Sequence, residues 1–178
     1  MVSNGAGKRS PSDEVDALWR VFYERSFADV AGYALRLTGG RRAAAEDLVH
    51  DAYLAMVRAW GDGRVDHLDT GWLIVVVRQR FLNSVRDGRR ENRRLRLVHG
   101  SGSSAELARA DTSAGSSMEA LLSGLPDRAR AALVLRYVDD LSVAAVADGL
   151  GLTVRATESL LARARGQIRR EQREGRHG

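Results

Sequence analysis

Residues 99–117 divide the 178-residue chain into two apolar segments of unequal length. This 19-residue stretch is made almost entirely of small and polar residues, with only one leucine, which is typical of a flexible linker. A flexible coil of that length spans about 25 Å r.m.s.. We therefore expect two small domains, residues 13–98 and 118–174, preceded by a disordered tail at residues 1–12, which are rich in Ser, Gly and Asn.

Glycines divide the first domain into three stretches of helical length. Apolar residues recur at roughly helical spacing before Gly39-Gly40, which is expected to end the first helix. The second helix is expected from Ala43 to Trp60, before Gly61-Asp62-Gly63, and its predicted buried stripe repeats every four residues. The members of that stripe are Leu48, Ala52, Met56 and Trp60.

The third stretch begins at Thr70, which is a suitable N-cap residue. The apolar, β-branched run from Trp72 to Val77 favours a strand locally. However, apolar residues continue through Phe81 and Val85, and no partner strand is evident nearby. We therefore predict a helix, and expect Trp60 and Trp72 to lie in the core.

The second domain has the outline of a helix-turn-helix. Pro126 can start a helix, Ser142 can cap a short one, Gly149-Leu150-Gly151 can form the turn, and Thr153 can cap a long arginine-rich helix. The predicted apolar set of the helix after Pro126 is Ala129, Ala132, Leu133, Leu135 and Tyr137. Together the two segments predict an all-α fold of two small helical domains joined by a flexible linker.

Positive charge is concentrated in two blocks. The chain has 28 basic and 23 acidic residues, a net charge of +5, and Lys8 is its single lysine. Residues 78–96 carry +6 and residues 155–176 carry +4, which leaves −5 on the rest of the chain. A GC-rich genome would explain the preference for arginine over lysine, but not this clustering. Two basic blocks on an acidic remainder indicate two separate contacts with a polyanion.

Several function classes are excluded or disfavoured by composition. The chain has no cysteine, which excludes disulfides, thiolate catalysis and zinc–cysteine sites. Asp47, His50 and Asp51 have metal-ligand spacing, but no further ligands accompany them, so we predict no metal site, no cofactor and no catalytic residues. The longest apolar run has six residues, far fewer than the roughly 20 that span a bilayer. With no apolar signal segment at residues 1–16, we expect no membrane insertion and a cytoplasmic protein.

Three segments resemble, in order, parts of the extracytoplasmic-function sigma factors, a group within the sigma-70 family. The first segment, from Ala45 to Trp60, resembles the one that binds the RNA polymerase core. It begins Ala45-Glu46-Asp47-Leu48-Val49-His50-Asp51-Ala52-Tyr53-Leu54. The second segment resembles the helix that contacts the promoter's minus-ten element. The residues that carry this resemblance are Trp72-Leu73, followed by Arg78-Gln79, Asn83 and Arg86. Residues 125–165, which begin Leu125-Pro126-Asp127-Arg128, resemble the domain that reads the minus-thirty-five element.

The resemblance implies an alternative sigma factor that binds polymerase core, directs it to promoters and assists opening of the DNA. It implies contacts with duplex and melted promoter DNA, and a possible anti-sigma factor as a further partner. The core-binding residues implied are Glu46, Asp47, His50, Asp51 and Leu54. The minus-ten residues implied are Asp66 and His67, in the loop where the family captures a base, with Arg78, Gln79, Arg80, Asn83, Arg86, Arg89 and Arg90. The minus-thirty-five residues implied are Arg155, Glu158, Ser159, Arg163 and Arg165.

Two other functions stay open at this point. A stand-alone helix-turn-helix regulator, with an N-terminal domain that senses a ligand or dimerises, would explain the second domain but not the basic block at residues 78–96. A small nucleic-acid enzyme such as a recombinase would need a nucleophile or a carboxylate–metal cluster, and the sequence offers neither. Thr157, Glu158 and Leu160 differ from the residues usual in the sigma family, so the resemblance does not indicate a promoter sequence.

Overall fold

The computed structural model describes residues 11–99 and 117–174, and the side chains of residues 13–88 and 120–173. Within these ranges the fold is all-α, as predicted, with seven helices joined by turns and loops and no strand. They are α1 (Pro11–Thr38), α2 (Arg42–Gly61), α3 (Thr70–His99), α4 (Ser117–Ser123), α5 (Asp127–Tyr137), α6 (Val143–Leu150) and α7 (Val154–Glu174). Apart from the ends of α1, α3 and α4, the predicted tail and linker lie outside the described residues.

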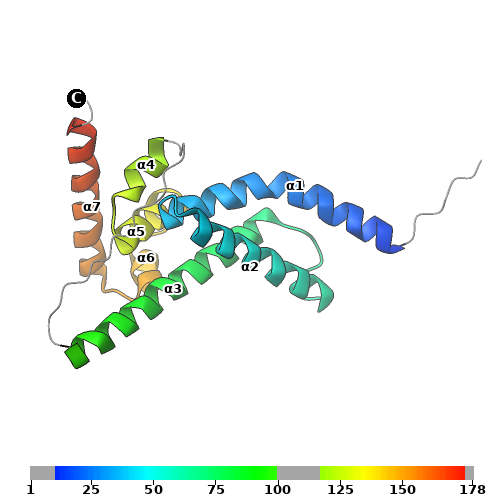
Figure 1. The fold of residues 1–178 in the computed structure, drawn as a ribbon, viewed down its shortest axis with the longest axis horizontal. Coiled ribbons are helices and arrows are strands. Elements are labelled where there is room, and N and C mark those ends of the chain that lie inside the picture. Colours follow the sequence, from blue (N-terminus) through cyan, green and yellow to red (C-terminus); the bar gives the residue numbers. More distant parts are fainter. Residues whose placement is uncertain (1–10, 100–116, 175–178) are drawn as a thin grey trace, which may run out of the picture.

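The first domain is a bundle of α1, α2 and α3 (Figure 1). The buried stripe of α2 consists of Ala45, Val49, Ala52, Met56 and Ala59. Two members of the predicted stripe, Leu48 and Trp60, are only half-buried. A strict four-residue repeat drifts around a helix that has 3.6 residues per turn, so the real stripe alternates steps of three and four.

The predicted helix ends are confirmed, with one correction. Gly39 and Gly40 follow α1 with φ values of 66° and 78°, a left-handed conformation that glycine adopts without steric cost. Asp69, rather than Thr70, caps α3, because its carboxylate accepts from the backbone N–H groups of Gly71 (2.9 Å) and Trp72 (3.3 Å). The run from Trp72 to Val77 is helical throughout.

The second domain contains the predicted helix-turn-helix. The Ser142 hydroxyl accepts from the backbone N–H of Ala145, and the Thr153 hydroxyl accepts from that of Ala156, so both predicted caps are confirmed. Gly151 turns the chain between α6 and α7 with a φ of 62°. Of the predicted apolar set of α5, Tyr137 at the last residue of the helix is not buried, because its side chain is 55% exposed.

The two domains pack against each other. α1 contacts α4 and α5, and α3 contacts α5 and α6, while the other half of α1 extends away from the second domain (Figure 1). One hydrophobic cluster therefore includes Val30 and Leu37 of the first domain together with Leu125 and Val134 of the second.

Candidate nucleic-acid interface

The predicted core-binding residues lie along one side of α2. Glu46, Asp47, His50 and Leu54 are exposed, and Asp51 is half-buried. The stripe of small and apolar residues on the opposite side packs against the rest of the bundle, and this packing fixes the orientation of the helix. The acidic face is thus available to a partner with basic groups.

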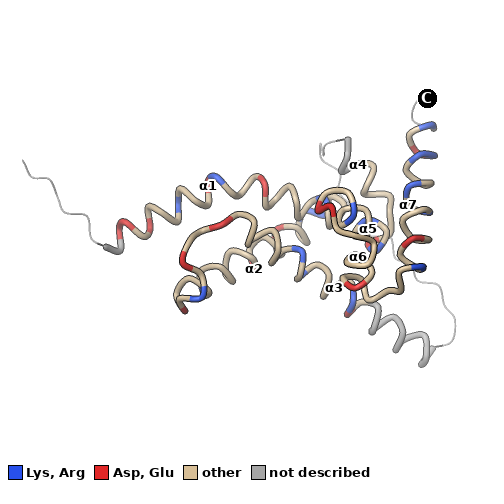
Figure 2. The backbone as a smooth tube through the Cα atoms, turned by 180° about the vertical axis from the view of Figure 1, so that it is seen from behind, with Lys and Arg blue, Asp and Glu red and all other residues tan. Residues whose placement is uncertain are grey.

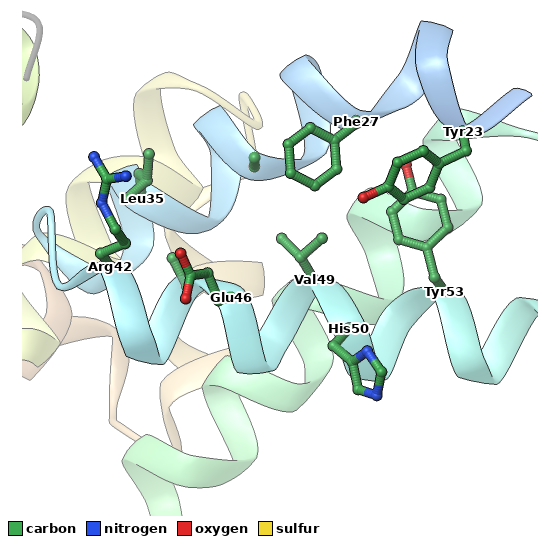
Figure 3. Close-up of a pocket in the computed structure, with 10 residues that line it drawn as sticks. Tyr23, Phe27, Leu35, Arg42, Glu46, Val49, His50 and Tyr53 are labelled. Carbon is green, nitrogen blue, oxygen red and sulfur yellow. The ribbon is translucent and has the colours of Figure 1, made fainter. Parts of the chain in front are cut away.

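A groove with a volume of about 370 Å³ lies between α1 and α2, beside this acidic face. Phe27 of α1 and Val49 of α2 point into the space between the two helices, and Glu46 and His50 lie at its edge (Figure 3). Tyr23 and Phe27 lie four residues apart on α1 and are 45% and 40% exposed. Neither residue stands out in the sequence, because Val15, Leu18 and Val21 of the same helix are exposed as well.

An ion pair joins a residue that the resemblance assigns to polymerase binding and one that it assigns to minus-ten DNA binding. Arg80 Nη1 of α3 lies 2.8 Å from Asp51 Oδ2 of α2, and both side chains are more than 40% exposed. The acidic face of α2 is therefore continuous with the basic face of α3.

The predicted minus-ten residues of α3 are divided between solvent and the second domain. Gln79 and Asn83 are exposed. Arg78 instead contacts Asp139, with 3.2 Å between Nη1 and Oδ2, and Arg86 donates to the backbone carbonyl of Asp148 (2.9 Å). Arg89 and Arg90 belong to α3, but their side chains lie outside the described residues.

The loop between α2 and α3 presents the other two predicted minus-ten residues. Asp66 and His67 are exposed, and Asp66 Oδ1 lies 2.6 Å from His67 Nδ1. The hydrogen bond from His67 lowers the pKa of the Asp66 carboxyl, so Asp66 is an anion at neutral pH. The carboxylate of Asp66 therefore disfavours a nearby phosphate.

The first turns of α7 present the predicted minus-thirty-five residues. Arg155, Glu158, Ser159 and Arg163 are all exposed, and basic residues recur along the whole helix (Figure 2). Thr157 is completely buried, and its hydroxyl donates to the carbonyl of Thr153. The unusual residue at 157 is therefore part of the core, whereas the unusual Glu158 is on the exposed face. Arg165 is exposed as well and donates to the hydroxyl of Tyr137 (3.1 Å).

The described residues hold neither a metal-binding cluster nor a membrane-spanning helix. Within 11–99 and 117–174, no three His, Asp or Glu side chains are grouped so that they could hold a metal ion. None of the helices in these ranges is long and apolar enough to cross a membrane.

Comparison with known proteins identifies both domains. Residues 22–91 match the model of sigma-70 region 2, and residues 116–168 match the model of sigma-70 region 4 in the form typical of extracytoplasmic-function sigma factors. Among solved structures, the sigma factor RpoE of Bartonella quintana, crystallised with the anti-sigma factor NepR, is 21% identical. That match covers 89% of this chain and 96% of RpoE, with a TM-score of 0.47. No curated protein matches the sequence significantly.

The two family matches together cover well over half of the chain, and they occur in the order that the sequence predicts. A region 2 in the first domain rules out the stand-alone regulator, and the family is not enzymatic. The chain therefore belongs to the sigma-70 family, as an extracytoplasmic-function-like sigma factor that binds RNA polymerase and directs it to promoter DNA.

Proposed function

We propose that the three predicted residue sets form three separate contacts in promoter recognition. In this proposal α2 and the adjoining groove bind polymerase core, α3 and the loop at residues 62–69 bind the opened minus-ten element, and α7 reads the minus-thirty-five element. The observation that carries the proposal is the exposure of Arg155, Glu158, Ser159 and Arg163 immediately after the helix-turn-helix turn. In proteins of this architecture, the N-terminal residues of the second helix contact base edges in the major groove.

The polymerase contact combines charge with an apolar anchor. Glu46, Asp47 and Asp51 can attract basic groups on the partner, which favours encounter and orientation. The groove between α1 and α2 can then bury an apolar side chain of the partner between Phe27 and Val49. A large apolar anchor surrounded by charged groups is the usual arrangement of a binding hot spot.

The minus-ten contact combines cations with an anionic loop. Opening DNA costs about 1.4 kcal/mol per base-pair step on average. Arginines on α3 can hold the phosphates of the separated strand, and a base bound by the loop would offset part of the opening cost. Because RNA polymerase and promoter DNA are in the cytoplasm, we propose that the protein acts there. An anti-sigma factor as a further partner stays a prediction from the sequence resemblance.

The direct test is transcription reconstituted with purified core polymerase and genomic DNA fragments. We expect specific start sites that depend on this protein, and co-elution of the protein with core on a sizing column. Failure to bind core, or to initiate on any fragment, would contradict the proposal.

Arg163→Ala is expected to weaken binding of the holoenzyme to upstream promoter DNA by about 1–3 kcal/mol if the guanidinium reads a guanine. No change in core binding is expected, because Arg163 is exposed on α7 and belongs neither to the α2 face nor to the groove beside it. Electrophoretic mobility shifts and core titrations measure the two affinities. Arg20→Ala, which removes an exposed arginine of α1, is the matched control; equal losses for both variants would rule out a specific role for Arg163.

Phe27→Ala is expected to weaken core binding by about 2 kcal/mol, because it removes one of the three aromatic side chains that line the groove. Val15→Ala is the control, since Val15 is an exposed apolar residue of the same helix and does not line the groove. Fluorescence titration of labelled protein with core measures the affinity, and melting curves check the fold. If the two variants bind core equally well, the groove is not part of the contact.

A further inference from the structure

Tyr137, the exposed last residue of α5, makes a polar contact with α7. Nη1 of Arg165 donates to the Tyr137 hydroxyl oxygen over 3.1 Å. The direction of this bond is fixed, because a guanidinium has five N–H donors and no acceptor. The hydroxyl oxygen is therefore the acceptor, and its own proton remains for a second partner. Among the described residues, no oxygen accepts that proton.

The ring of Tyr137 is also held by its neighbour on α5. The Arg136 guanidinium lies over the ring, 5.6 Å from its centroid. Arg136 is itself fixed at the end of the helix, because it pairs with Asp140 (3.1 Å) and donates to the Leu141 carbonyl (3.3 Å). The hydroxyl is thus kept beside Arg165 before any ligand arrives, which lowers the entropy cost of binding one.

Arg165 lies on the same side of α7 as Glu158, seven residues earlier. Seven residues come within about 20° of two full helical turns and rise about 10.5 Å along the axis. The major groove of B-form DNA is about 8.5 Å deep. When the first turn of α7 reaches base edges, the position of Arg165 is therefore near the rim of the groove, where the phosphates lie.

The positive charge of Arg165 has no acidic partner among the described residues. The nearest candidates on the α5–α6 connection are both engaged elsewhere, Asp140 by Arg136 and the buried Asp139 by Arg78. The exposed Arg165 and Tyr137 thus offer a charged N–H donor and a neutral O–H donor side by side. A phosphate diester has two unesterified oxygens on one phosphorus, so it can accept from both donors at once.

We propose that Tyr137 and Arg165 form a two-donor clamp for a single backbone phosphate of the minus-thirty-five duplex. The inference rests on the proposed role of α7 and adds to it a residue of α5. A phosphate contact carries no sequence information, but it fixes where a recognition helix lies along the groove. The clamp would therefore set which base pairs Glu158 and Arg163 meet.

Two substitutions test the two donors, each with a matched control. Tyr137→Phe removes the hydroxyl and keeps the ring, and Tyr23→Phe makes the same change at an exposed tyrosine of α1. Arg165→Ala removes the charged donor, and Arg20→Ala removes an exposed arginine of α1. Melting curves check that all four variants fold.

The first measurement is the affinity of holoenzyme, formed with saturating core, for a labelled duplex that the wild type selects from a random-sequence library. Tyr137→Phe is expected to weaken binding about tenfold, as for the loss of a hydrogen bond to a charged acceptor. Arg165→Ala is expected to weaken it by a similar factor, and the double variant by much less than the product, because the two donors share one acceptor. Unchanged affinity of Tyr137→Phe, or losses that multiply, would overturn the clamp.

The second measurement separates the charged donor from the neutral one. The slope of log affinity against log salt is expected to become shallower by about 0.9 for Arg165→Ala and to stay unchanged for Tyr137→Phe, because only the first removes a cation. A change in the selected base sequence with Tyr137→Phe would mean that the hydroxyl contacts a base, and would overturn the phosphate assignment.

The third measurement identifies the phosphate. Uncharged methylphosphonate linkages are placed one at a time along the selected duplex, and wild-type binding is expected to weaken at the clamped position. That position should stop mattering in both Tyr137→Phe and Arg165→Ala, while the other positions keep their effects. Two different positions for the two variants would mean independent contacts rather than one clamp.

These outcomes are distinct from failure of the proposed function. A loss of affinity with Arg163→Ala but none with Tyr137→Phe would remove the clamp and leave base reading by α7 standing. Losses with the clamp variants but none with Arg163→Ala would do the reverse. If the protein does not bind core, the same titrations are made with the full chain alone at about 0.05 M salt, where phosphate contacts are stronger.

Discussion

Replacing Arg130 by alanine is expected to lower the free energy of unfolding by about 3 kcal/mol, because buried carbonyls lose their donor and a buried side chain loses its packing. The guanidinium donates to the carbonyls of Leu37, Leu122 and Leu125 from a site that is almost closed to water. Urea denaturation followed by circular dichroism at 222 nm measures the change.

Arg136→Ala is the control on the same helix. Arg136 pairs with the exposed Asp140 and donates to a single carbonyl, that of Leu141 (3.3 Å), from a side chain that is 34% exposed, so its replacement is expected to cost only about 1 kcal/mol. Equal losses from the two substitutions would mean that the interior contacts of Arg130 add nothing beyond helix propensity and surface charge.

Met56→Ala is expected to cost about 2–5 kcal/mol of unfolding free energy, because it leaves a cavity in the core of the first domain. Met56 is completely buried on the α2 stripe that faces the bundle. The adjacent Val57 is 50% exposed, and Val57→Ala is expected to change stability by no more than about 0.5 kcal/mol. Urea denaturation measures the free energy of unfolding of both variants and of the wild type. A larger loss for Val57→Ala than for Met56→Ala would contradict this assignment of the core.

The helices could be predicted from local signals, since their ends depend on residues close in sequence. Each of these signals acts on backbone within three or four residues. The stop at Gly39-Gly40 and the caps at Ser142 and Thr153 are all present in the structure. The exception was the start of α3, where Asp69 and Thr70 are both good capping residues and only the backbone geometry decides between them. The stripe on α2 was half right because a four-residue repeat approximates a helical period only over a short distance.

The contacts between the domains could not be predicted, because they join residues far apart in sequence. Asp139 is 106 residues from Tyr33 and 61 from Arg78. Nothing near Arg78 indicates that it pairs with an aspartate instead of remaining exposed for DNA. One local signal was available for Arg130, an arginine flanked by alanines on a helix whose next residues are nearly all apolar. A guanidinium at such a position must either reach solvent or donate to buried acceptors, and that of Arg130 donates to buried acceptors.

The two glycines at the end of α1 should have different evolutionary histories. Both need a left-handed backbone, so asparagine or aspartate could replace Gly40, where a Cβ would meet open space. At position 39 any Cβ would overlap the guanidinium of Arg130. Substitutions at 39 are therefore expected together with a shortened or displaced side chain at 130, which would make these positions a covarying pair across the boundary between the domains.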